Sequence, residues 1–63
     1  MMGDVLFTAK TWMKKSKRNR MLYDDFASLC RENDTTIDKM IDKGYLYTRG
    51  EYVELTVKGL VMA

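Results

Sequence analysis

Basic side chains are the residues of this chain whose type and spacing most favour a chemical role. Between Val5 and Tyr23 there are six lysines and arginines and no acidic residue, and five of the six lie in the segment KKSKRNR at 14–20. From Asp24 to Glu54 the balance reverses, to eight acidic residues against four basic ones. This asymmetry indicates a polyanion or an acidic partner. A solvated, lysine-rich helix end is the alternative.

Residues that support catalysis or metal binding are few. Histidine is absent and Cys30 is the only cysteine, which removes the usual zinc ligand sets and a Cys-His nucleophile pair. Asp24 and Asp25 fall on a polar helix face with no evident partner that would shift a pKa. We therefore expect a protein that is not an enzyme and that has no metal, no cofactor and no small-molecule substrate.

The length of the chain, 63 residues, predicts a single domain, 1–63, that buries only about 60% of its unfolded surface. Such a domain is marginally stable, and dimerisation or docking on a partner would add burial. A single thiol without a disulfide fits a reducing interior. No apolar run approaches the roughly 20 residues that span a bilayer. We expect a cytoplasmic protein that makes no contact with a membrane.

The first element that must position the basic residues is a helix from Asp4, its N-cap, to about Ser16. Its apolar stripe contains Val5, Ala9 and Trp12, extended by neighbouring apolar residues. Phe7 falls on the opposite side of this helix. An aromatic residue there is either an isolated surface residue or part of a contact with a second chain, and we favour the contact.

A second helix is expected from Arg20 to about Glu32, with Asn19 as its cap and Leu22, Phe26 and Leu29 in its apolar stripe. Cys30 borders that stripe, which predicts a small buried hydrophobe and not a reactive thiol.

A short turn then leads to a third helix, 35–43. Asp34 or Thr35 can cap this helix, and Gly44 stands where a left-handed residue would end it. Two helices joined by a turn of about three residues are typical of a helix-turn-helix.

Residues 45–55 predict a β-hairpin. A two-residue turn at Arg49-Gly50 would pair Leu46 with Val53 and Tyr47 with Tyr52. The two tyrosines would either stabilise the hairpin as a cross-strand pair or stack on a partner or on single-stranded bases. Thr56 can cap a last helical turn through VKGLVMA.

The segment IDKGYLYTRGEYVELTVKG, in this order of elements, resembles the winged helix-turn-helix family. The resemblance covers the second helix onward, about two-thirds of the chain. It implies a mostly α fold with a small β-hairpin (α+β): three helices, a two-stranded wing and a short C-terminal helical turn.

The resemblance also implies roles for individual residues. The third helix would lie toward a major groove, the hairpin tip at Arg49 would be the wing, and phosphates would meet the amino end of the second helix. The nucleic-acid contacts implied are Lys14, Lys15, Lys17, Arg18, Asn19, Arg20, Thr35, Thr36, Lys39, Lys43 and Arg49.

The function implied is a double-stranded-DNA-binding transcriptional regulator, as a homodimer. The alternative is a winged-helix module that binds another protein, as a small inhibitor or adaptor. It would use the acidic third helix, Phe7 and the outer tyrosines, Tyr47 and Tyr52.

Overall fold

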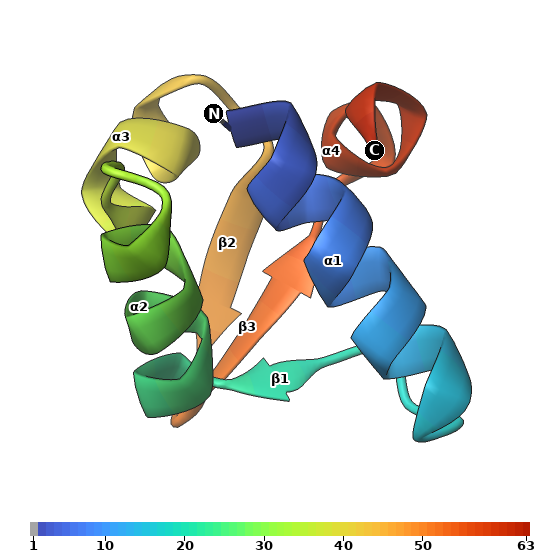
Figure 1. Cartoon of the computed structure of the whole chain (residues 1–63). Helices are drawn as coiled ribbons and strands as arrows, with labels where there is room; N and C mark the ends of the chain where they lie inside the picture. The colour runs from blue at the N-terminus through green and yellow to red at the C-terminus, as the bar shows by residue number, and fades with distance from the viewer. Residues whose placement is uncertain (1) are drawn as a thin grey trace.

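The apolar periodicity of the chain produces four helices and three short strands, an α+β fold (Figure 1). The computed structural model describes residues 2–63. The elements in chain order are α1 (Met2–Lys15), β1 (Met21–Leu22), α2 (Tyr23–Glu32), α3 (Ile37–Asp42), β2 (Leu46–Arg49), β3 (Tyr52–Leu55) and α4 (Val57–Met62).

The core lies between the helices and one face of the sheet. Figure 1 shows α2 and α3 on one side of the strands, α1 running diagonally beside them, and α4 next to α1. Phe26 at the centre of α2 is fully buried. It lies among apolar side chains from all of the first three helices and the sheet, namely Val5, Leu6, Ala9, Met13, Met21, Cys30, Ile37, Met40, Leu46 and Val53. This burial is the main favourable contribution to folding.

The sheet has the order β1-β3-β2, so β3 is the central strand and both of its neighbours are antiparallel to it. The expected two-stranded hairpin is therefore part of a three-stranded sheet. Met21 pairs with Val53 and Leu22 with Tyr52. The sequence analysis assigned Met21 and Leu22 to the second helix, which begins instead at Tyr23.

The predicted hairpin register was wrong by two residues. Leu46 pairs with Leu55 and Thr48 with Val53, and the turn residues are Gly50 and Glu51 instead of Arg49 and Gly50. Gly50 has a φ of 60°, as a type II′ turn requires at its first central position. A shift of two residues leaves each side chain on the same face, because side chains alternate with a period of two.

The first three helices end in the same way. In each, the residue just beyond the C-cap has a positive φ: Lys17 at 60°, Asp34 at 55° and Gly44 at 79°. After α1, the Lys17 N–H donates to the Lys14 carbonyl and the Arg18 N–H to the Met13 carbonyl. Equivalent pairs of bonds follow α2 and α3. These are Schellman motifs, in which a left-handed residue satisfies the last carbonyls of a helix.

The first three helices begin at other residues than the predicted N-caps indicate. Asp4 lies inside the first turn of α1 and is not its N-cap. Asn19 does not cap α2, whose N-cap is Leu22 and makes no side-chain cap hydrogen bond. The cap of α3 is Thr36, one residue after the predicted Thr35, and its hydroxyl accepts from the Lys39 N–H at 3.2 Å.

The last helix is joined to the junction between α3 and β2. The Thr56 hydroxyl caps α4 by accepting from the Gly59 N–H at 3.0 Å, which confirms the predicted cap. The same hydroxyl donates to the Gly44 carbonyl at 2.6 Å. Gly59 lies against the Tyr45 backbone so closely that a Cβ there would be 2.9 Å from the Tyr45 carbonyl carbon.

Among the described residues, none of the helices combines the length and the apolar character that crossing a membrane requires.

Candidate nucleic-acid interface

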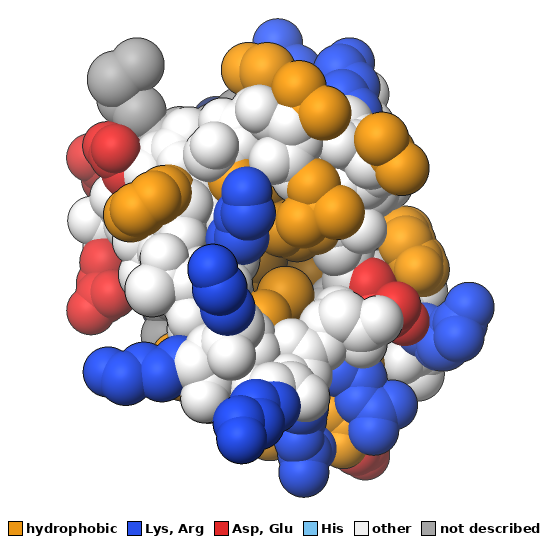
Figure 2. Space-filling model, turned by 90° about the vertical axis from the view of Figure 1, so that its right-hand side faces the viewer, with side chains coloured by type: hydrophobic (Ala, Val, Ile, Leu, Met, Phe, Trp, Pro, Cys, Tyr) orange, Lys and Arg blue, Asp and Glu red, His pale blue; other side chains and the backbone are white. Residues whose placement is uncertain are grey.

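The basic end of α1 is the most concentrated charge in the molecule. It comprises five exposed cations at the end of the helix and in the loop after it: Lys14, Lys15, Lys17, Arg18 and Arg20. None of the five has an ion-pair partner among residues 2–63. Figure 2 shows basic side chains bordering a central hollow and continuing below it, on the side where α1 and α4 lie. These charges are therefore free to meet an anion.

The Schellman motif orders this loop. Besides the two backbone bonds, the Ser16 hydroxyl donates to the Trp12 carbonyl at 3.0 Å. Lys17 takes the left-handed position that glycine usually fills. The basic side chains thus extend from an ordered turn.

The side chain of Arg20 packs against the hairpin. Its guanidinium carbon lies 4.1 Å from the centre of the Tyr52 ring, a distance at which a cation is attracted to an aromatic face. Arg20 joins the basic end to the face of the hairpin that points away from the core.

Arg49, predicted as the wing arginine, is not at the hairpin tip. It is the last residue of β2, opposite Tyr52, and its Nε lies 3.5 Å from Oε2 of Glu54. The Tyr47 hydroxyl donates to Oε1 of the same carboxylate at 3.1 Å. That hydrogen bond, together with partial desolvation, raises the pKa of Tyr47 above its ordinary value of 10.0.

The predicted pairing of Tyr47 with Tyr52 was therefore wrong, since Glu54 stands opposite Tyr47. The turn residue beside Gly50 is Glu51, so the tip carries an acidic side chain and not a basic one.

The residues predicted on the third helix divide into two groups. Thr35 is buried and its hydroxyl has no hydrogen-bond partner among the described residues, while the hydroxyl of Thr36 serves as the helix cap. Lys39 and Lys43 are exposed. In Figure 1, α3 lies at the opposite end of the molecule from the loop that follows α1. The structure thus brings together the cations of 14–20 but does not bring α3 to them.

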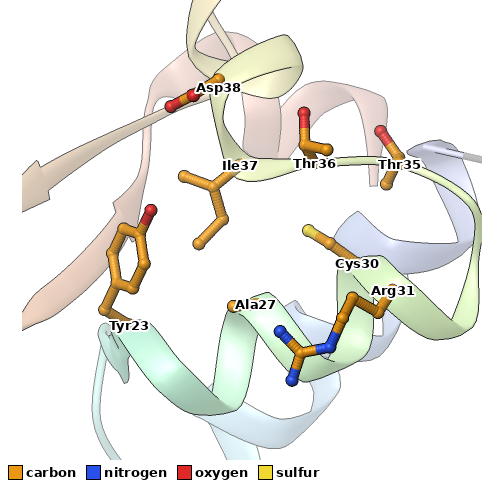
Figure 3. Close-up of a pocket in the computed structure, with 8 residues that line it drawn as sticks. All are labelled: Tyr23, Ala27, Cys30, Arg31, Thr35, Thr36, Ile37 and Asp38. Atoms are coloured by element: carbon orange, nitrogen blue, oxygen red, sulfur yellow. The ribbon is translucent and has the colours of Figure 1, made fainter.

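A small pocket of about 160 Å³ lies between α2 and α3 (Figure 3). Ala27, Ile37 and the buried Cys30 form its apolar part, and Tyr23 and Arg31 flank it. Burial raises the pKa of the Cys30 thiol, and its sulfur lies 3.8 Å from that of Met40. The thiolate, which is the reactive form, is therefore disfavoured, in line with the expected buried hydrophobe. Across the described part of the chain, no group of acidic, cysteine or histidine side chains could hold a metal ion.

A larger concavity of about 290 Å³, here called the hollow, lies beside the basic end (Figure 2). It is lined by Lys10, Met13, Arg18, Asn19, Tyr47, Glu54, Leu55 and Leu60. The sequence analysis found Arg18, Asn19 and Tyr47 but not the others. Those come from α1, β3 and α4, and no spacing along the chain relates these three elements.

Phe7 is 62% exposed on α1 and borders a shallow groove with Trp12. Trp12 was expected in the buried stripe but is 43% exposed, at its edge. On α4, Val57 and Val61 are also largely exposed. The fold thus leaves apolar side chains exposed on both α1 and α4.

Comparison of the chain with protein-family models, with curated proteins and with solved structures found no match.

Proposed function

We propose that this protein is a winged helix-turn-helix regulator of transcription that binds double-stranded DNA. The observation that carries the proposal is the basic end of α1, five cations at the end of the helix and on the ordered turn after it, with no carboxylate paired to them among residues 2–63. Each phosphate that such a cation neutralises releases a counterion, which favours binding at low salt.

The order of elements supports the family. Two helices, α2 and α3, are joined by the turn 33–36 and followed by the β2–β3 hairpin, as in a helix-turn-helix with a wing. In this proposal the basic end is the principal contact with the phosphate backbone. Because α3 lies at the opposite end of the molecule, its expected contact with the major groove, through Lys39 and Lys43, is a secondary one. Arg49 contributes less than a free arginine would, because Glu54 accompanies it.

The second candidate is a winged-helix module that binds a basic protein. It is favoured by the acidic side chains of α2, α3 and the turn between them, which are exposed and have no ion-pair partner within residues 2–63. These residues are Asp24, Asp25, Glu32, Asp34, Asp38 and Asp42.

Binding of a labelled random-sequence duplex across a salt series tests the proposal. We expect the logarithm of the affinity to fall linearly with the logarithm of salt concentration. The double variant Lys14→Gln/Lys17→Gln should reduce the magnitude of that slope by about 2, since each lost phosphate contact removes about 1.

The matched control is Lys39→Gln/Lys43→Gln, which removes the same charge from α3. A smaller loss of slope is expected, because the neighbouring Asp38 and Asp42 oppose phosphate contact there. An equal loss from both pairs would show that the basic end is not the principal contact. Absence of duplex binding at low salt, with the protein folded by circular dichroism, would overturn the proposal and favour the protein-binding module.

A further inference from the structure

The hollow is built from five parts of the fold, namely α1, the loop after it, β2, β3 and α4. Met13 of α1, Leu55 of β3 and Leu60 of α4 provide its apolar surface, and the loop after α1 provides Arg18 and Asn19. Met13 is almost completely buried, whereas Leu60 is 44% exposed at the edge. The hollow is therefore an apolar surface with polar groups around it, as ligand sites commonly are.

The charges around the hollow favour an anion. Lys10 and Arg18 line it, and neither has an ion-pair partner among the described residues. The one carboxylate present, Glu54, already accepts from the Tyr47 hydroxyl at 3.1 Å and lies 3.5 Å from the Arg49 Nε. Its negative charge is thus largely balanced, while the two cations remain unbalanced.

The position of the hollow beside the basic end indicates which class of anionic ligand fits it. It opens beside the basic end, and Arg18 belongs to both. A ligand here can place an apolar group in the hollow and a succession of negative charges along the loop after α1. An unpaired nucleotide within a strand has this composition: a flat base, a phosphate on each side, and polar edges that an amide such as Asn19 can meet. Aromatic side chains in basic grooves bind such bases by stacking, and Tyr47 is the aromatic residue that lines this hollow.

We infer that the hollow binds one unpaired base of a nucleic-acid strand whose neighbouring phosphates lie against Lys10 and Arg18. This rests on the proposed function only in that a nucleic acid occupies the basic end. A base inside a duplex is stacked and paired and cannot enter, so the site distinguishes a strand with an unpaired base from a continuous duplex.

The test compares three labelled ligands at one salt concentration: a blunt duplex, the same duplex with a short single-stranded tail, and the tail strand alone. The tailed duplex should bind at least about fivefold more tightly than the blunt one, which is the factor given by base stacking of about 1 kcal/mol. Equal binding of blunt and tailed duplexes would overturn the inference.

Two variants on α4 separate the hollow from general electrostatics. Leu60→Glu places a carboxylate at the edge of the hollow. Val61→Glu makes the same change of charge one residue further along, at a side chain that is 77% exposed and does not line the hollow. The gain from the tail should disappear in Leu60→Glu and persist in Val61→Glu, with both variants folded by circular dichroism. Loss of the gain in both variants, or in neither, would contradict the assignment of the hollow.

Binding of the tail strand alone separates a failure of the base site from a failure of the proposed duplex-DNA regulator. If the blunt duplex does not bind but the single strand binds and is weakened only by Leu60→Glu, then the regulator of duplex DNA is wrong and the base site stands. If the blunt duplex binds and the tail adds nothing, the base site is wrong and the regulator stands.

Discussion

Glu54 fixes the arrangement of the neighbouring side chains on the outer face of the hairpin. Its two oxygens contact the Tyr47 hydroxyl and the Arg49 Nε, and its own side chain is only 14% exposed. A carboxylate that organises two neighbours in this way holds both in defined positions, although an ion pair to an exposed arginine contributes little to stability. The tyrosine and the arginine are therefore held together as one unit on the outer face of the hairpin.

Replacement of Glu54 should change the titration of Tyr47. The hydrogen bond to Glu54 is the largest cause of the raised pKa, so Glu54→Gln should lower the pKa of Tyr47 toward its ordinary value. Because the pKa of Tyr47 is higher in the folded protein than in the unfolded one, the hydrogen bond contributes its full stability at pH values below the unfolded-state pKa. That contribution is lost as the pH rises through the folded-state pKa. An alkaline titration followed by NMR of the Tyr47 ring measures the pKa in both proteins.

Glu51→Gln is the control for this titration, since it removes the same charge from the same hairpin but does not touch Tyr47. The Tyr47 pKa should be unchanged in Glu51→Gln. Equal shifts in the two variants would show that general charge, and not the hydrogen bond, raises the pKa.

The attachment of α4 depends on Gly59. A Cβ at this position would collide with the Tyr45 backbone, and backbone atoms cannot move aside as a flexible side chain can. We expect Gly59→Ala to destabilise the fold by about 1–3 kcal/mol, the usual cost of overpacking. Chemical denaturation measures the change, and a loss of about 1 kcal/mol lowers the melting temperature of a domain of this size by about 4–8 °C.

Gly3→Ala is the matched control on α1, where a Cβ would meet nothing within 4 Å. Because alanine is favoured over glycine in helices, this variant should be as stable as the parent or more stable, by up to about 1 kcal/mol. If both alanines were tolerated equally, the close approach of α4 to Tyr45 would be refuted.

Sequence periodicity predicted the first three helices and the faces of the hairpin, because apolar spacing marks most of the positions that become buried. The α+β class was implied by the resemblance to the winged helix-turn-helix family, and the last helical turn was predicted from the Thr56 cap. Periodicity did not predict β1, since two residues, Met21 and Leu22, are too few to show a period of two. It also misplaced the start of the second helix and the hairpin turn, because cap and turn choices differ by small free energies that neighbouring elements decide. Here the strand pairing of Met21 with Val53 outweighed the helix cap that Asn19 could have provided.

The candidate site was predicted only as far as it is local in sequence. The cations of 14–20 are neighbours along the chain and remain together in the structure. The hollow was missed because Lys10, Leu55 and Leu60 meet only through tertiary packing.

Charge is segregated across the whole molecule, which measures only 26 × 23 × 19 Å. The basic end of α1 lies opposite α3, and six of the nine acidic side chains belong to α2, α3 and the turn between them. Such a distribution orients the protein as it approaches a polyanion and speeds association at low salt.

We predict a homodimer in which Phe7 makes the contact. An exposed aromatic residue at 62% gains burial in a dimer, and a protein that folds and dimerises together has a melting temperature that rises with its concentration. Phe7→Ala should lower the mass measured by sedimentation and remove the concentration dependence.

Val57→Ala is the comparison on α4, where the side chain is 78% exposed; it should leave the mass unchanged. A parent protein that sediments as a monomer at all concentrations would disprove the dimer, and a dimer that survives Phe7→Ala would place the contact elsewhere.

At Lys17 the thermal stability of the protein and the positive charge of the basic end depend on the same residue. It holds the left-handed position after α1 with a φ of 60°, where a residue with a Cβ is disfavoured by roughly 1–2 kcal/mol relative to glycine. A glycine there would relieve the backbone and remove a cation in a single step. Directed evolution for heat resistance alone would therefore tend to erode the basic end, and variants selected that way should be screened for what they still bind.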